Sequence, residues 1–394
     1  MYSHEDERSL GLNLIGIISI MVASSLTIMV GSAVVPAVPA IGEYYKLGDY
    51  AGWVITTPAL GVIVFSLLAG KLIDRIGSYL AVKIALVAYG IIGVTGFLMP
   101  SIFLLLTNRF LLGIATVIVM AGSTDLISKF YIGKERLNML AIQGMAIELG
   151  GVLYLSISGI LAETSWKLSF LIYGVSFVAF ILMKFYFPEP KAKNHMKIED
   201  KKDNLKSTNK ISIIFICTFL GMLIFFTAII YLPVYFQNIL GYSTSFTGYY
   251  LASISLVAVI SAGIMPKIVS CFSANICLIN GFFSYAIGNI ILIMSDSILC
   301  LALAAIFLGI GFGLTHALYN NLVVENSNQN NQGFNLSLFA MMAFLGQFLS
   351  PGIVTLFKEK SIFITAGILA IIVVFIIFFF LDENSNEKIS CICE

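Results

Sequence analysis

The sequence predicts an all-α integral membrane protein with twelve transmembrane helices arranged as two six-helix halves. Of its 394 residues, 59% are hydrophobic and 11% are charged, whereas soluble domains carry about 25% charged residues. The apolar residues gather into runs of roughly 20, the length that crosses a hydrocarbon core of ~30 Å. A hydrophilic segment, 188–210, separates the sixth run from the seventh. No soluble fold could bury this much apolar surface.

Short polar turns separate most of the predicted spans. In chain order the spans cover residues 11–34, 50–70, 79–99, 102–124, 138–161, 167–187, 211–235, 246–268, 274–294, 297–320, 334–357 and 361–381. The first ten residues are acidic, unlike the basic start of a secretory signal, so we expect the first span to be retained. The predicted organisation is a tail (1–10), a bundle (11–187), a linker (188–210), a bundle (211–381) and a tail (382–394).

The distribution of basic residues predicts the orientation. If both termini are cytoplasmic, the lysines and arginines gather on the cytoplasmic side, as membrane proteins favour. Arg109 lies within a span, and the exceptions on the outer side are Lys46, Lys167, Lys358 and Lys360. We therefore expect a multi-pass protein of a bacterial-type inner membrane, with both termini cytoplasmic.

The two halves also look like distant copies. Residues 70–74 align with residues 263–267, and residues 112–114 align with residues 308–310 at a similar offset. Such echoes predict two repeats related by an axis along the membrane normal, which would rock around a central cavity.

Several classes of function are disfavoured by composition and spacing. A formal net charge of +1 gives no indication of a nucleic-acid partner, and the three histidines and six cysteines show no metal-ligand spacing. The Gly-x-x-x-x-Gly-Lys-Ser/Thr loop of ATP-driven pumps does not occur. With no nucleophile–base pattern either, we expect neither an enzyme nor a metal or cofactor site.

A charged loop and an arginine-bearing span carry a family resemblance. The loop reads Gly70-Lys71-Leu72-Ile73-Asp74-Arg75-Ile76-Gly77, and the span contains Leu105-x-x-x-Arg109-x-x-x-Gly113. Both resemble signatures of the major facilitator superfamily. The runs 34–41, 159–166 and 231–243 are similar to segments of its twelve-helix drug:proton antiporters. The resemblance implies two six-helix halves and secondary transport.

The loop departs from the family pattern after its second glycine. Basic residues usually follow there, but this chain has Ser78 and Tyr79. In the family's charge relay, Asp74 and Asp125 would be the two acids. The base would then be Arg75 or Lys83. The predicted gating loop consists of Gly70, Asp74, Arg75, Gly77 and Asp125.

The fifth span departs from the antiporter pattern Gly-x-x-x-Gly-Pro-x-x-Gly-Gly. Its central glycine and proline are replaced by Leu155 and Ser156, and a later glycine by Ser158. Small residues still allow close helix packing. The direction of transport is therefore less strongly predicted than the fold.

Two ionisable residues inside the spans are candidates for proton coupling. Arg109 would lie about 10–12 Å from the outer face and Glu148 about 15 Å from the inner face, at similar depths on consecutive helices. Because burial raises a carboxyl pKa and a nearby cation lowers it, Arg109 could hold Glu148 in a useful range. The alternative is a static ion pair, with Arg109 as a packing residue.

The substrate cavity is predicted from aromatic and polar residues in apolar spans. Such residues supply apolar contact and a few oriented hydrogen bonds, although each aromatic residue could equally face lipid. The candidates are Tyr154, Tyr231, Tyr235, Gln237, Tyr249, Asn280, His316 and Gln347. An alternative for His316 is a hydrogen-bonded position at a helix contact.

We therefore expect a monomeric, proton-coupled exporter of small amphipathic molecules in the lipid bilayer, working by alternating access. One alternative is a carrier, in either direction, of a specific metabolite such as a siderophore or amino-acid-like compound. A more distant alternative is a membrane sensor that kept the fold without transporting.

Overall fold

A computed structural model describes residues 12–189, 208–327 and 332–380, and these residues form helices and connections without a strand. Twelve helical segments are long and apolar enough to cross a membrane, which confirms the predicted fold class. The helices are α1 (Leu14–Ser32), α2 (Val38–Tyr44), α3 (Trp53–Ile76), α4 (Ser78–Thr95), α5 (Ile102–Phe130), α6 (Gly133–Thr164), α7 (Trp166–Ser169), α8 (Val175–Tyr186), α9 (Thr208–Val234), α10 (Thr244–Cys271), α11 (Ala274–Met294), α12 (Ile298–Glu325), α13 (Gln332–Leu356) and α14 (Ser361–Phe380). Both predicted tails and most of the predicted linker lie outside the described residues.

Among the described residues, three spans are interrupted by tighter or wider turns. The sixth span, Trp166–Tyr186, has a 3-10 turn at Phe170–Gly174 between α7 and α8. The first span runs from Leu14 to Tyr44, with a short 3-10 turn at Val35–Ala37 between α1 and α2. Pro36 lies in this turn, and proline cannot donate the backbone hydrogen bond of a continuous helix. The seventh span continues beyond α9 as a π-helical turn, Tyr235–Ile239, which begins two residues after Pro233.

The charged loop is not the short turn that the sequence predicts. Helix α3 continues through Asp74 and Arg75 to Ile76, and the chain turns at Gly77. Gly77 has a φ of 83°, which glycine adopts without a steric penalty. A Cβ on Gly70 would meet no atom within 4 Å, so this glycine has no role in close packing here. The turn of the hairpin itself therefore requires glycine at position 77.

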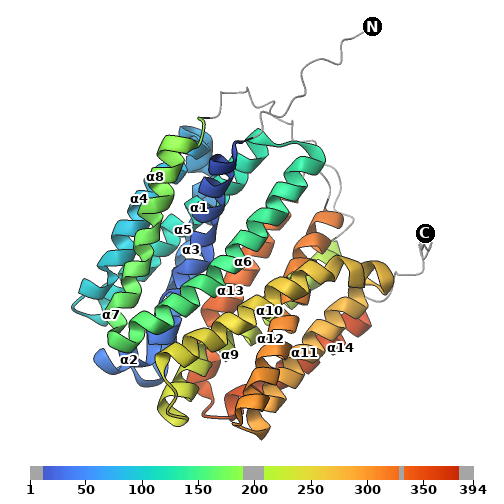
Figure 1. Ribbon diagram of the computed structural model, residues 1–394. Coiled ribbons are helices and arrows are strands. Elements are labelled where there is room, and N and C mark those ends of the chain that lie inside the picture. The colour runs from blue at the N-terminus through green and yellow to red at the C-terminus, as the bar shows by residue number, and fades with distance from the viewer. Residues whose placement is uncertain (1–11, 190–207, 328–331, 381–394) are drawn as a thin grey trace. The chain divides into compact units, whose positions relative to one another are not determined.

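The described residues group into two units by their contacts. The first contains those within Met1–Met196 together with Leu232–Ser255, and the second contains those within Lys197–Tyr231 and Leu256–Glu394. In the first, α1 packs against α5, α6 and α8, while α3 and α4 both pack along α5. Helices α4 and α8 lie side by side (Figure 1). In the second, α11 packs against α12 and α14.

Candidate functional site

Arg109 of α5 is completely buried within the first unit and is held by three acceptors. Its Nε donates to the carbonyl oxygen of Val54 at 3.0 Å, and its Nη1 donates to the Tyr173 hydroxyl at 2.6 Å. Its Nη2 donates to the carbonyl oxygen of Val30. A buried guanidinium is costly unless its N–H groups are hydrogen-bonded, and these contacts occupy all three of its nitrogen atoms.

Both carbonyl groups lack an ordinary helical partner. Val54 lies four residues before Pro58, which has no N–H to donate back to it. Val30 lies in the last turn of α1, where carbonyls have no intrahelical donor and carry the negative end of the helix dipole. Arg109 therefore caps the end of α1 and fills the gap that a proline opens in α3.

Glycines bring α5 close enough to α3 for this contact. A Cβ on Gly113 would lie 2.0 Å from the Pro58 carbonyl oxygen, and a Cβ on Gly61 would lie 2.2 Å from that of Phe110. Any side chain at either position would push the helices apart. The Arg109-x-x-x-Gly113 pattern thus combines the capping residue with the residue that allows it to reach its acceptor.

Two tyrosines extend the same network onto α1. Tyr173 donates to the Val30 carbonyl oxygen at 3.0 Å while accepting from Arg109. Tyr89 of α4 donates to the Leu26 carbonyl oxygen at 2.7 Å, and its ring contacts that of Tyr173 edge-on. Neither residue was predicted from the sequence. The sequence feature that could have pointed to both tyrosines is a polar hydroxyl group within an apolar span.

Glu148 does not pair with Arg109. Among the described residues, ion pairs join Lys129 to Asp125 and Lys360 to Asp296, and the nitrogens of Arg109 are directed elsewhere. Glu148 lies at the middle of α6 and is half-buried. The two candidates for proton coupling are therefore separate features in this conformation.

Helical periodicity places Glu148 on a defined face of α6. It shares a stripe with Gly151, Leu155 and Gly159, at spacings of three and four residues. A Cβ on Gly159 would lie 2.9 Å from the Gly248 Cα, and a Cβ on Gly248 would lie 2.6 Å from the Leu155 carbonyl oxygen. Glu148 therefore lies on the same side of α6 as Gly159, the residue at which α6 meets the start of α10.

Polar contacts surround this α6–α10 contact, which we define by Gly159, Glu163, Ser245 and Gly248. Ser245 donates to the Glu163 carboxylate at 2.6 Å. The π-helical turn adds Gln237, whose Nε2 donates to the Pro36 carbonyl oxygen at 2.8 Å. The backbones approach here because both helices carry glycine, although Leu155 and Ser156 interrupt the antiporter pattern.

A second polar cluster joins α6 to α1. The Gln143 Nε2 atom donates to the Ser24 hydroxyl at 2.8 Å and lies 3.4 Å from the Thr124 hydroxyl. Tyr154 shares a 2.7 Å hydrogen bond with Ser25. Tyr154 was a predicted cavity residue, whereas Gln143 was missed although an amide inside a span is a recognisable signal.

The predicted gating residues are only partly connected. Asp125 pairs with Lys129 at 2.7 Å, and Lys129 also donates to the Ser78 hydroxyl at 2.9 Å. Asp125 is thus paired with a lysine one turn away on its own helix, and a relay through Arg75 or Lys83 stays a prediction. Lys83 lies 4.1 Å from the centre of the Tyr79 ring. Asp74 and Arg75 are exposed.

The remaining cavity candidates divide between the two units. In the first, Tyr235 is buried and Tyr249 is 54% exposed. In the second, the Tyr231 ring contacts Phe363, Gln347 is buried and Asn280 is exposed. A cavity lined by these residues stays a prediction.

His316 lies in an aromatic cluster that the sequence analysis did not predict. Its ring stacks on Phe312 with centroids 5.3 Å apart and tilts against Phe339 at 5.6 Å. Phe312 in turn stacks on Phe225 at 4.2 Å. Three helices, α9, α12 and α13, contribute these rings, so the cluster could not be recognised from local spacing.

Comparisons with known proteins agree with this architecture. The family model described as the Major Facilitator Superfamily matches residues 20–351. Multidrug resistance protein 1 of Bacillus subtilis (strain 168) is 28% identical over 138 residues, which cover 35% of this chain and 36% of that protein. The Protein TsgA homolog of Buchnera aphidicola subsp. Schizaphis graminum (strain Sg) is 25% identical over 369 residues, covering 89% of this chain and 92% of that protein.

Solved structures share the fold at low sequence identity. The D-xylose-proton symporter superposes with a TM-score of 0.77 at 15% identity, covering 93% of this chain and 98% of that one. A bacterial homolog of the human lysosomal transporter Spinster, inward-facing and unoccupied, has a TM-score of 0.76 at 15% identity, with coverages of 94% and 98%. Together with the twelve apolar helices, these matches show that the chain is a multi-pass membrane protein belonging to the Major Facilitator Superfamily of transporters.

Proposed function

We propose that this protein exports small amphipathic molecules in exchange for protons, by alternating access in a bacterial-type inner membrane. The observation that carries the proposal is the position of Glu148. It is an acid inside a span, on the face of α6 that leads to the α6–α10 contact. Ionisable residues within membrane helices are costly and are usually retained for function.

Glu148 carries the proton in this proposal, and Arg109 organises the helices. The nitrogens of Arg109 are bound to Val30, Val54 and Tyr173, so the arginine acts on α1 and α3 rather than as a partner of the acid. A neutral Glu148 can lie in an apolar environment, whereas its carboxylate requires water or a counter-charge. Protonation would therefore favour a conformation in which Glu148 lies among apolar side chains, and deprotonation one in which it meets water or a counter-charge.

The aromatic cluster around His316 supports the substrate class. Phe225, Phe312, Phe339 and His316 pack against one another in this conformation. In the proposed cycle they would offer aromatic rings and one imidazole to a flat apolar substrate. The partial similarity to a multidrug resistance protein points the same way.

The test is transport in proteoliposomes with an imposed pH gradient, using a panel of amphipathic dyes. Wild-type protein should accumulate dye against its gradient, and Glu148→Gln should bind dye but move it only downhill. Glu135→Gln, an acid at the start of the same helix, serves as the matched control and should remain coupled. Uphill transport by Glu148→Gln would contradict the role of Glu148, and transport indifferent to collapse of the pH gradient would contradict proton coupling altogether.

A carrier of one specific metabolite is the second candidate. It is favoured by Leu155 and Ser156, which interrupt the antiporter pattern of the fifth span. The same vesicles distinguish the two, because a specific carrier would reject the dyes and exchange a single class of polar solute.

A further inference from the structure

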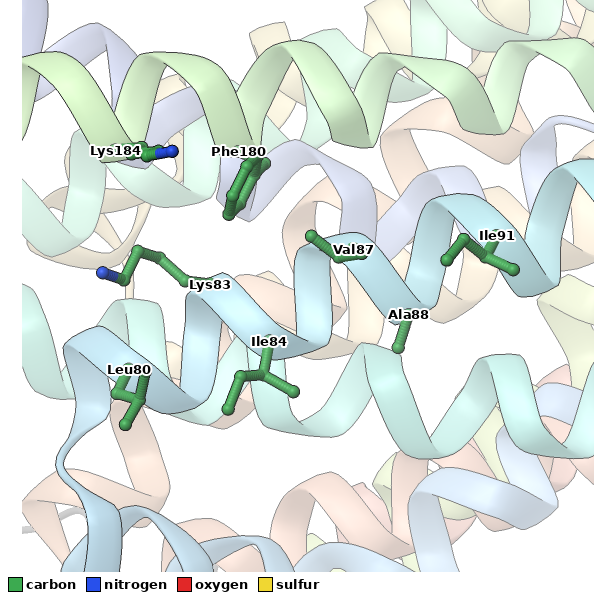
Figure 2. Close-up of a pocket in the computed structure, with 8 residues that line it drawn as sticks. All are labelled: Leu80, Lys83, Ile84, Val87, Ala88, Ile91, Phe180 and Lys184. Carbon is green, nitrogen blue, oxygen red and sulfur yellow. The ribbon is translucent and has the colours of Figure 1, made fainter.

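A groove runs along the outer surface of the first unit between α4 and α8. It has a volume of about 530 Å³. The residues that line it are Leu80, Lys83, Ile84, Val87, Ala88, Ile91, Phe180 and Lys184. Figure 2 shows both lysines at one end, with Val87, Ala88 and Ile91 following along α4 away from them. The groove therefore has a cationic end and an apolar body.

We propose that this groove binds an anionic phospholipid, with the headgroup phosphate at Lys83 and Lys184 and an acyl chain along α4. This inference rests on the membrane location of the chain and is independent of the substrate and of proton coupling.

The two lysines are available to an anion. Lys83 lies five residues into α4 and Lys184 two residues before the end of α8, so both are near the same membrane surface. Within the described part of the chain neither forms an ion pair, and Glu189, three residues after the end of α8, pairs with neither, although its charge acts on Tyr79. Their ammonium groups lie over rings, Lys83 at 4.1 Å from the Tyr79 centroid and Lys184 at 5.5 Å from the Phe185 centroid.

The apolar body of the groove matches one leaflet in length. From Leu80 to Ile91, α4 rises about 16 Å at 1.5 Å per residue, close to half of a hydrocarbon core of ~30 Å. Leu80, Ile84 and Ile91 are each about half exposed, at 45%, 55% and 53%. Side chains of this kind on a membrane helix face lipid tails.

A second hollow offers a place for a second acyl chain. It measures about 190 Å³, lies between α3, α4 and α5, and shares Ile84 and Ala88 with the first. Ile84 and Ala88 of α4 thus lie between two apolar grooves, and a diacyl lipid could place one acyl chain in each groove. Because this hollow has no charged lining residue, selectivity must come from the lysine end of the first groove.

The charge of the headgroup decides the class of lipid. Basic residues near a membrane surface attract anionic lipids by about 1 kcal/mol each, or about fivefold in affinity per lysine. A zwitterionic phosphatidylcholine carries its own cation and gains much less. On the predicted orientation this end faces the cytoplasm, where lysines at the ends of α4 and α8 would meet the inner leaflet.

Native mass spectrometry of the full chain can test the proposal, with phosphatidylglycerol and phosphatidylcholine of identical acyl chains added to the detergent. Wild-type protein should retain phosphatidylglycerol at least tenfold more tightly. The double variant Lys83→Ala/Lys184→Ala should lose about 25-fold in affinity for phosphatidylglycerol and little for phosphatidylcholine. Lys83→Arg/Lys184→Arg should keep the preference.

Two further variants keep the proposal falsifiable if the alanine pair folds poorly. Ala88→Phe would fill the groove without changing charge, and should weaken binding of phosphatidylglycerol several-fold. Lys210→Ala/Lys267→Ala removes two lysines of the second unit and should leave binding unchanged. Equal losses in the two double-lysine variants, or equal retention of the two lipids by wild-type protein, would overturn the proposal.

Discussion

The Nε atom of Arg109 donates to the carbonyl oxygen of Val54, the acceptor that Pro58 leaves without a helical donor. The arginine thus performs the task of a missing backbone N–H, on another helix. This relationship gives a membrane arginine an architectural role that does not require a carboxylate partner. It also means that substitutions at Arg109 should affect folding before they affect coupling.

Arg109→Ala should lower the stability of the protein in detergent. Its removal strips the Val54 carbonyl of its donor and weakens the end of α1, at about 1–3 kcal/mol for a buried group left unpaired. Arg109→Lys should recover part of the loss, because an ammonium cannot reproduce the planar guanidinium contacts. Thermal unfolding would measure both, with the exposed Arg136→Ala as control. A lysine variant of normal stability that had lost proton coupling would instead place Arg109 in the coupling step.

Gly113→Ala should be among the most damaging single-methyl changes in the first unit. The added Cβ would lie 2.0 Å from the Pro58 carbonyl oxygen, a backbone atom that cannot move aside without shifting α3. Overpacking of this kind costs about 1–3 kcal/mol or more. Gly144→Ala is the matched control, because its Cβ would meet no atom within 4 Å. Equal folding yields and melting temperatures for the two variants would contradict the close α3–α5 packing.

Gly248→Ala should loosen the α6–α10 contact, because its Cβ would lie 2.6 Å from the Leu155 carbonyl oxygen. In a background whose native cysteines are replaced by serine, a cysteine introduced at the buried Thr247 should then react faster with a water-soluble maleimide. Gly263→Ala on the same helix has open space around its Cβ and should leave the labelling rate unchanged. Slow labelling in both variants would show that this contact tolerates a methyl group.

Asp74→Asn should slow conformational cycling more than it weakens substrate binding. Asp74 is exposed on the last turn of α3, where the helix dipole disfavours a negative charge. Its substitution should therefore leave stability unchanged or slightly raised. Equilibrium binding and turnover, measured on the same preparation, separate the two effects, with the exposed Asp49→Asn as control. Lost affinity with normal turnover would exclude a gating role.

The number and placement of the membrane helices could be predicted because length and hydropathy are local properties. The sequence also singled out Arg109, since a charge inside a span is conspicuous. Its acceptors could not be predicted, because Val54 is made available by a proline on another helix and Val30 by a helix end. Likewise, Lys129 was overlooked as the partner of Asp125, although an acid and a base four residues apart on one helix is a local signal.

The aromatic cluster could not be predicted, because it is formed by residues that are far apart in the sequence. His316 was noticed as a titratable residue in an apolar span, but Phe225 and Phe339 are ordinary phenylalanines until the helices are packed. The packing role of a glycine also depends on which helices meet. Gly70 and Gly113 look equivalent in a motif, yet the first has open space and the second touches backbone.

The continuation of α3 to Ile76 has a mechanical consequence. If Asp74 and Arg75 lay on a flexible connector, their positions would be nearly independent of the helix tilt. Because they lie on the last turn of α3, whose one proline, Pro58, is near the other end, they are fixed to the helical segment that follows Pro58, about 27 Å long at 1.5 Å per residue. A tilt of this segment by about 10° around Pro58 would displace its charged end by about 5 Å, given that length. If the loop has the gating role that we predict, a change in the tilt of α3 would move both charges together, with the chain turning at Gly77.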